Sequence, residues 1–382
     1  MKKIIGIVVE YNPFHNGHLY QINKIKEKYK DSLIIVCMSS SFTQRADASI
    51  LNKWDKTKVA LENNVDIVIE LPYIYSTQSS DIFASKAVQL LNHLKINTLC
   101  FGSETENIDD IVNSAKIQLN NKDFDNKVKE YLDLGINYPT ALNNALKDLN
   151  AKEINTPNDL LGVSYIKEIL KNNLNIEIFN IKRTNDFHDI TSNDDVISAS
   201  NIRNKLQNKQ DIKNNVPQNV YELLKNKNIE IDEFKYLKYK IITEDNLDKY
   251  VDVDEGISSR IKKSLEKSNN KEELIQNIKT KRYTYNKICR MLNHILCSFT
   301  KEENNQTKNL EYIRILGFTE QGKQYLNEIK NDIKLPILNK YDTKKYKTLE
   351  IELRATQIYS LIYEDILKQE IQNKPIYKKT EI

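Results

Sequence analysis

Apolar and polar residues alternate along the first 200 positions in an order that predicts strands and helices in turn. Short apolar runs rich in β-branched residues and bounded by turn residues are typical of buried parallel strands. Five such runs lie at residues 4–9, 33–38, 66–71, 98–101 and 175–181. Helical spacing lies between them, as for Leu19, Ile22 and Ile25. The pattern predicts an α/β fold with a doubly wound, Rossmann-like parallel sheet, whose ligand lies beyond the carboxyl ends of the strands.

The rest of the pattern divides the chain into two parts. Residues 108–149 are predicted to form a helical insert, and the polar stretch 210–217, which ends in a proline, interrupts the regular spacing. Beyond it the apolar spacing is mostly helical, and no second set of strands is predicted. The 382 residues also exceed the usual size of one domain. We therefore predict an α/β domain at residues 1–210 and a mostly α-helical domain at residues 211–382.

The first predicted strand leads into a turn that suits an anion. Pro13 ends the strand because it donates no hydrogen bond, and His15-Asn16-Gly17-His18 opens the next helix. A helix N-terminus offers free N–H groups and the positive end of the helix dipole, usually to a phosphate. Two histidines three apart lie on one side of that helix, and Gly17 lets a flat base approach the backbone. The alternative is a pair of surface histidines at an ordinary helix start.

A second pattern of the same kind is ISASNIR at residues 197–203. Ser198 is a natural N-cap, and Ser200 and Arg203 lie three apart on one side of the helix that follows. A hydroxyl group and a guanidinium group at a helix start suit phosphate oxygens. Taken alone, the segment could equally be a capped helix without a ligand. Two such motifs around five alternating strands favour a phosphate site.

Charge is distributed unevenly between the two parts. The whole chain has a net charge of +4, and residues 206–382 contain 33 Lys and Arg against 27 Asp and Glu, whereas the remainder contains 24 against 26. Basic residues gather between positions 260 and 290, with Tyr283 and Tyr285 among them. Cations bind RNA phosphates and tyrosines stack on exposed bases, so this segment is a candidate RNA surface. The alternative is a charged helix face in solvent.

Other sequence features exclude several classes of protein. The four cysteines are widely spaced and form no CxxC pair, which predicts buried free thiols and neither a zinc site nor disulfides. No apolar run approaches the ~20 residues that span a bilayer. The N-terminus enters a strand at once, so a signal peptide is not expected. We expect a cytoplasmic protein that does not bind a membrane, with no metal-ligating set and no obligate protein partner.

The two motifs resemble the signatures of the HIGH nucleotidyltransferases, relatives of the class I aminoacyl-tRNA synthetases. ISASNIR resembles the ISSTxxR-type motif, with Ala199 in place of its second serine. Longer blocks resemble the bacterial tRNA(Met) cytidine acetate ligase family over nearly the whole chain. These blocks include GIVVEYNPFHNGHLYQI, SFTQRADASILNKWDKTKVAL, VDIVIELPYIYSTQS, CFGSE, PNDLLGVSYIKEI, EGISSRI and KTKRYTYNKICRML. One departure is Ala46, where the family often has glycine after Gln44 and Arg45.

This resemblance implies an enzyme that activates acetate with ATP to acetyl-adenylate, releases pyrophosphate, and acetylates N4 of the wobble cytidine of elongator tRNA(Met). Mg²⁺ is a candidate helper ion. The residues implied to be catalytic are His15, His18, Ser200 and Arg203. The residues implied to hold ATP are Ile7, Val8, Val9, Glu10, Tyr11, Asn12, Pro13, Phe14, His15, Asn16, Gly17, His18, Leu19, Tyr20, Gly102, Asn158 and Arg183. The residues predicted to bind RNA are Lys281, Arg282 and Arg290.

Several alternatives stay open from the sequence. The chain could be an adenylyltransferase for a small phosphorylated metabolite, or a non-catalytic protein that binds RNA or senses ATP. Asn158 could be a helix N-cap, and Arg183 could be a solvated surface residue. Gln44 and Arg45 are placed where a small carboxylate or the cytosine could be bound, although a polar surface loop would look the same.

Overall fold

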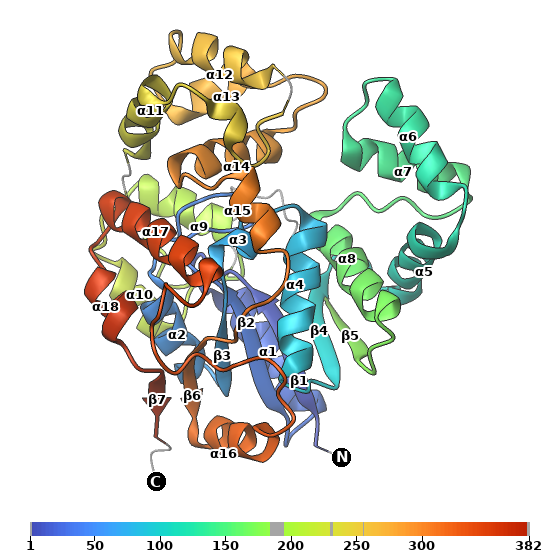
Figure 1. The fold of residues 1–382 in the computed structure, drawn as a ribbon. Helices are drawn as coiled ribbons and strands as arrows, with labels where there is room; N and C mark the ends of the chain where they lie inside the picture. The colour runs from blue at the N-terminus through green and yellow to red at the C-terminus, as the bar shows by residue number, and fades with distance from the viewer. Residues whose placement is uncertain (1, 184–194, 230–231, 255, 380–382) are drawn as a thin grey trace.

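A seven-stranded sheet forms the centre of the computed structural model, which describes residues 2–183, 195–229, 232–254 and 256–379 (Figure 1). The strand order across the sheet is β5-β4-β1-β2-β3-β6-β7. The strands are β1 (Ile4–Val9), β2 (Leu33–Ser39), β3 (Ile67–Leu71), β4 (Thr98–Ser103), β5 (Glu177–Lys182), β6 (Ile315–Thr319) and β7 (Ile376–Lys378). The five apolar runs found in the sequence are β1 to β5.

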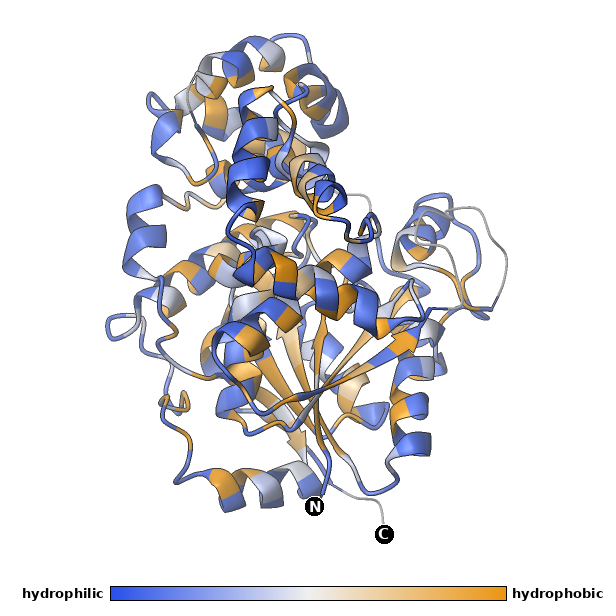
Figure 2. Cartoon of the chain, turned by 90° about the vertical axis from the view of Figure 1, so that its right-hand side faces the viewer, coloured by the Kyte–Doolittle hydropathy of each residue, from blue (hydrophilic) through white to orange (hydrophobic). Residues whose placement is uncertain are grey.

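The first five strands are parallel, which confirms the predicted doubly wound sheet. β1 lies between β2 and β4, while β3 and β5 pair with the outer edges of β2 and β4. Both faces of the sheet are covered. In β2, Ile35 and Cys37 pack into one hydrophobic core, and Ile34 and Val36 pack into the other. This burial on two sides explains why the strands are apolar almost throughout, as their orange colour in Figure 2 shows.

Helices on the two faces complete the cores. One face contacts α1 (Asn16–Lys28), α2 (Lys53–Glu62), α9 (Ala199–Gln207) and α10 (Gln218–Leu224). The other face contacts α3 (Tyr73–Ser76), α4 (Ser80–His93), α5 (Ile108–Asn120), α8 (Pro157–Lys171), α16 (Glu320–Ile329) and α17 (Lys347–Ile362). Phe42 and Trp54 are buried in these cores. All four cysteines are also buried and free, which confirms that prediction.

Two helical groups stand outside these layers. α6 (Phe124–Asp133) and α7 (Tyr138–Asp148) form a small cluster that projects from the body on the α5 side (Figure 1). A larger group, which we call the helical body, spans residues 233–296 and has its own hydrophobic core. Its elements are α11 (Glu233–Thr243), a 3₁₀ turn (Leu247–Lys249), α12 (Ile257–Leu265), α13 (Lys271–Ile278) and α14 (Tyr285–Leu296). Ala46, which follows β2, packs into that core, so the helical body lies over the carboxyl ends of the parallel strands.

The C-terminal part is mostly helical, as predicted, but it also contributes two strands to the first sheet that were not predicted. After α15 (Lys301–Gln306) the chain returns to the sheet, where β6 pairs antiparallel with β3 and β7 pairs parallel with β6. The two strands have five and three residues, and each is defined by its pairing with a neighbouring strand. α18 (Leu367–Gln372) lies between α17 and β7. The second part of the chain therefore extends the first sheet as well as forming the helical body.

Among the helices that the structure describes, none combines the length and apolar character that a membrane span requires.

Candidate nucleotide-binding site

The strand order creates a crevice beside β1. From β1 the chain proceeds to β2 and β3 on one side, and it then crosses to β4 and β5 on the other. Loops that follow β1 and β4 therefore diverge, and open α/β sheets bind their ligands at this switch point. The predicted site residues follow β1, β4 and β5 at this edge of the sheet, and the helical body lies above them (Figure 1).

The HNGH turn holds two imidazole rings against each other. His15 is the N-cap of α1, and its Nδ1 accepts a hydrogen bond from the Gly17 N–H at 3.0 Å. The His15 N–H in turn donates to His18 Nδ1 at 3.2 Å. The ring centroids lie 3.9 Å apart. Because each Nδ1 accepts a hydrogen bond, the proton of each neutral ring is on Nε2. The turn therefore presents two Nε2–H donors, as a phosphate site requires.

Both histidines are neutral in this environment. Burial, with a contribution from the nearby Arg183 and Arg203, lowers the pKa of His15 to about 3. Burial also lowers the pKa of His18 well below its usual value, with His15 and Arg183 contributing. A neutral imidazole can donate a hydrogen bond without being repelled by the positive charges of the two arginines. The arginines supply the positive charge that would attract an anion.

The second motif is attached directly to the first. Ser198 caps α9 by accepting a hydrogen bond from the Asn201 N–H at 3.1 Å. Arg203 donates through Nη1 to the Asn12 carbonyl at 2.7 Å and through Nη2 to Ser200 Oγ at 3.3 Å. The bond to Asn12 joins α9 to the turn that precedes the histidines. Ser200 and Arg203 thus lie on the same side of their helix, and the histidines and Arg203 meet at one end of the sheet.

The β4 and β5 side contributes a third group. Asn158 Nδ2 donates to Glu104 Oε1 at 2.5 Å, and Arg183 Nε lies 4.0 Å from the same oxygen. A Cβ added to Gly102 would lie 3.4 Å from Arg183 Cγ, an ordinary contact distance, so the arginine stem lies against this end of β4. The N-cap of α8 is Thr156, so the alternative that Asn158 caps this helix is wrong. The structure brings Gly102, Asn158 and Arg183 together around Glu104.

Sequence reasoning missed two carboxylates of this group. Glu104 follows β4 and links Asn158 to Arg183, as described above. Asp159 accepts hydrogen bonds from the Glu104 and Thr105 N–H groups, at 2.9 Å from Glu104 N to Oδ1 and 3.2 Å from Thr105 N to Oδ2. The segment Gly102-Ser103-Glu104 was recognisable as a strand end, but its partners on α8 lie more than fifty residues further along the chain.

The other residues that were predicted to hold ATP occupy β1, the turn and the first turns of α1. Ile7, Val8 and Val9 are in β1, and Tyr11 contacts the His18 ring edge-on, with centroids 4.8 Å apart. Asn16 Nδ2 donates to the carbonyls of Asp195 and Asn214, so it ties α1 to the segments around α9. Pro13 and Phe14 are buried, Leu19 is half-buried and Tyr20 is exposed. The roles of all these residues in ATP binding stay predictions.

The three residues predicted to bind RNA occupy different environments. Lys281 and Arg282 are exposed in the loop before α14. Arg290 is mostly buried, with its side chain 12% exposed and its Nε 3.7 Å from Asp252. Tyr283, which was considered for base stacking, lies in the core of the helical body, so that interpretation is wrong. Lys281 and Arg282 remain the accessible part of the predicted RNA surface.

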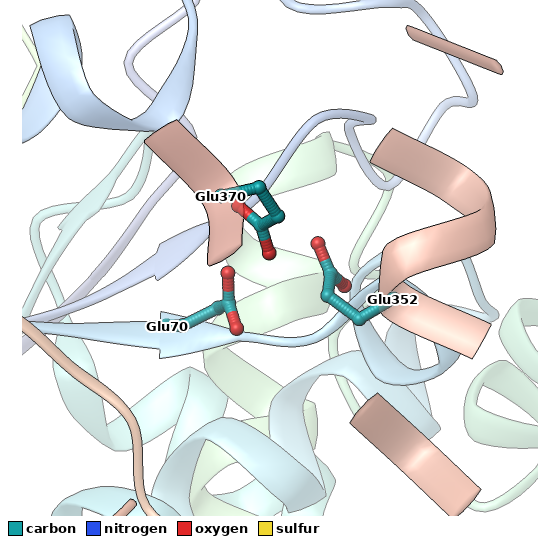
Figure 3. Close-up of side chains that lie close together, drawn as sticks. All are labelled: Glu70, Glu352 and Glu370. Atoms are coloured by element: carbon teal, nitrogen blue, oxygen red, sulfur yellow. The ribbon is translucent and has the colours of Figure 1, made fainter. Parts of the chain in front are cut away.

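Three buried glutamates meet on the opposite side of β3 from this site (Figure 3). Glu70, Glu352 and Glu370 come from β3, α17 and α18, and their carboxylates point toward one another. Lys53 Nζ lies 2.6, 2.7 and 3.1 Å from oxygens of the three, and Arg314 contacts Glu70 and Glu370. These two cations already fill the centre of the carboxylate cluster. It is therefore a buried ion network that joins the C-terminal helices to the sheet, and it does not suit a metal ion.

The sheet is Rossmann-like, an HxGH turn lies at its switch point, and α9 brings Arg203 against that turn. These features define a nucleotidyltransferase of the HIGH class. The sequence profile of the HIGH Nucleotidyl Transferase family matches residues 1–374. Proteins described as tRNA(Met) cytidine acetate ligase are similar along their whole length. The protein from Clostridium tetani is 38% identical over 401 residues, which cover 98% of this chain and 100% of the relative. The protein from Geobacillus sp. is 37% identical over 398 residues, which cover 98% and 99%.

Solved structures agree with the sequence relatives. The crystal structure of Thermotoga maritima TmcAL without ligand superposes with a TM-score of 0.91 at 27% identity and covers 99% of this chain and 100% of that chain. The structure of the same protein with bound alpha-thio ATP has a TM-score of 0.87 at 28% identity, with the same coverage. The chain therefore belongs to the family of tRNA(Met) cytidine acetate ligases.

Proposed function

We propose that this protein uses ATP and acetate to acetylate N4 of the wobble cytidine in elongator tRNA(Met). The observation that carries the proposal is the pair of Nε2–H donors of His15 and His18, joined through Asn12 to Arg203 at the switch point of the sheet. The names of the relatives supply the acceptor, tRNA(Met), and the alpha-thio ATP in the T. maritima protein supports the nucleotide.

The first step of the proposed reaction is the attack of an acetate oxygen on the α-phosphorus of ATP. Negative charge grows on the phosphate oxygens as pyrophosphate leaves, and fixed donors that face this charge lower the barrier. For this purpose the chain offers the Nε2–H groups of His15 and His18 and the guanidinium of Arg203 with Ser200 Oγ. We propose that Mg²⁺ enters on the phosphates of ATP.

The nucleoside part of ATP is proposed to lie toward β4 and β5. Asn158 and Arg183 supply polar groups beside Gly102 at the end of β4. In the second step, N4 of an unstacked cytidine attacks the acetyl carbonyl group, and AMP leaves. We propose that the exposed Lys281 and Arg282 bind RNA phosphates for this step. We also propose that the protein acts in the cytoplasm and requires no second protein.

One experiment tests the proposal against its alternatives. The protein is incubated with ATP, labelled acetate and bulk tRNA, and the label is located by digestion of the tRNA to nucleosides. We expect label in N4-acetylcytidine from elongator tRNA(Met), with release of AMP and pyrophosphate. Release of pyrophosphate only with a phosphorylated metabolite would indicate an adenylyltransferase. Binding of ATP or RNA without any product would contradict catalysis.

A further inference from the structure

Glu10, which is among the residues implied to hold ATP, lies between the two halves of the candidate site, and the proposed first step gives its carboxylate no role. It follows β1 directly and precedes Tyr11, whose ring contacts the His18 ring. Glu10 Oε1 accepts a hydrogen bond of 2.6 Å from the Gln44 N–H, in the loop that follows β2. The carboxylate therefore spans the ends of β1 and β2. Gly102 and Arg183, which are proposed to lie along the nucleotide, are on the other side of β1.

The loop that holds Glu10 also contacts the parts of the chain that would bring in RNA. Ala46 packs into the core of the helical body. Asp47 lies 3.4 Å from Arg203 and close enough to Tyr285 of α14 to affect its pKa. The loop formed by residues 44–47 thus touches the phosphate-binding helix α9 and the helical body at once. A cytidine presented from the helical body would reach the sheet beside this loop.

The surroundings of Glu10 favour the protonated form of its carboxyl group more than water does. Burial raises the pKa of its carboxyl group, although the Gln44 N–H, Arg45 and Lys56 oppose the rise, and Asp47 adds to it. Tyr165 of α8 also faces Glu10. Lys56 Nζ donates to the Glu10 carbonyl at 3.1 Å and to the Ser39 and Ser40 carbonyls at 2.8 and 2.9 Å. These bonds fix the backbone at the ends of β1 and β2, so the carboxylate is held in a defined place.

We propose that Glu10 is the general base of acetyl transfer to the cytidine. As the N4 nitrogen attacks the acetyl carbonyl carbon, the N–C bond forms and the bond from that carbon to the phosphate oxygen of AMP breaks. N4 loses one proton, which Glu10 Oε2 takes and then gives to water. AMP leaves with the electron pair of the broken bond, so no further reactant is needed. This inference rests on the proposed function, because it assigns a residue to the second step of that reaction.

The test compares Glu10→Gln with wild-type protein in the two half-reactions. Glutamine keeps an oxygen that can accept the Gln44 N–H, so the loop stays in place, but it cannot take a proton. Acetyl-adenylate formation is followed by acetate-dependent ATP–pyrophosphate exchange and by trapping with hydroxylamine, which needs no base from the protein. Transfer is followed by rapid quench from acetyl-adenylate formed in advance on the enzyme. Glu27→Gln, an exposed carboxylate on α1, is the control for loss of one negative charge.

We expect the transfer rate of Glu10→Gln to fall by about 100-fold or more, and this fall to exceed any change in exchange by at least about tenfold. The wild-type transfer rate should rise with pH as the carboxyl group loses its proton, and this rise should be absent in Glu10→Gln. Burial lowers the pKa of Lys56 to about 7 while Glu10 raises it, so Lys56 titrates in the same range; a Lys56→Met variant, which keeps Glu10, should therefore retain the rise.

Three outcomes would overturn the inference. These are transfer at the wild-type rate, equal losses in both half-reactions, and a wild-type pH profile in the variant. Failure of the proposed function would look different, since wild-type protein itself would then give no acetylcytidine.

Discussion

Gly17→Ala tests whether the close packing of the HNGH turn sets the position of a catalytic ring. A Cβ at Gly17 would lie 2.8 Å from His15 Cε1 and 3.0 Å from His15 Nδ1, whereas ordinary contacts begin at 3.4 Å. The His15 ring must therefore retreat by about 0.6 Å, against a His18 ring whose centroid is 3.9 Å away. The Nε2–H donor would move with the ring. Misplacement of about 1 Å can cost about 100-fold in rate, so we expect a loss of about 10- to 100-fold in adenylate formation.

The expected barrier increase is about 1.4 to 2.7 kcal/mol, measured as kcat/KM for acetate-dependent ATP–pyrophosphate exchange. The fold should survive, because alanine is preferred over glycine in helices by up to about 1 kcal/mol. A thermal melt checks this. The control is a double-mutant cycle with His15→Ala, which removes the ring that the new methyl group would strike. Gly17→Ala should then have no further effect on the exchange rate. An equal loss in both backgrounds, or a wild-type rate in the single variant, would refute the reasoning.

Three further predictions concern charge. Burial lowers the pKa of His15 to about 3, so between this value and ~6.5 the unfolded chain binds more protons than the folded one. The stability that neutral His15 contributes is therefore complete above pH ~6.5 and is lost as the pH falls toward 3, and His15→Gln should flatten the resulting fall of Tm. Lys53→Met should lower the unfolding free energy by about 3–5 kcal/mol in urea titrations, because it leaves three buried carboxylates with one cation fewer; an unchanged midpoint would contradict this. Reversal of Lys281 and Arg282 to glutamate should weaken tRNA binding and make its salt dependence shallower in filter-binding assays, whereas Arg290→Glu should mainly lower Tm.

Local patterns in the sequence were sufficient for the parallel sheet and for the two motifs. Strands β1 to β4 pack apolar side chains into the cores on both faces, β5 contributes partly buried apolar residues, and the HNGH turn is contained within four consecutive residues. Spacing of three along α9 was also enough to place Ser200 beside Arg203, which the hydrogen bond between them confirms. Structural features that depend on residues close together in the chain could therefore be predicted from the sequence.

Features that depend on distant partners were out of reach. β6 is paired with β3, almost 250 residues earlier, and only this pairing makes the short segment a strand. Arg290 looks like any basic helix residue until the fold brings Asp252 against it. Tyr283 resembles a stacking residue in the sequence, yet it faces the core of the helical body. Tertiary packing decided each of these cases, and no local periodicity records it.

The return of the chain to the sheet has a consequence for how RNA would be presented. The helical body leaves the α/β layers after α10 and rejoins them before β6, so it is attached at both ends. Tyr73 of α3 donates to Asn293 Oδ1 of α14 at 2.8 Å, which fixes the body from below, and the buried ion network around Lys53 locks α17 and α18 to β3. An acetyl-adenylate is open to attack by water, so a transfer enzyme benefits from an acceptor held at a fixed distance. The helical body is held by the hydrogen bond from Tyr73 and by α17, whose Ile358 and Ile362 pack against its core while the ion network fixes α17 to the sheet, so it can hold a tRNA loop in that way. The C-terminal strands, which the sequence pattern did not reveal, are thus part of how the two steps would be brought together.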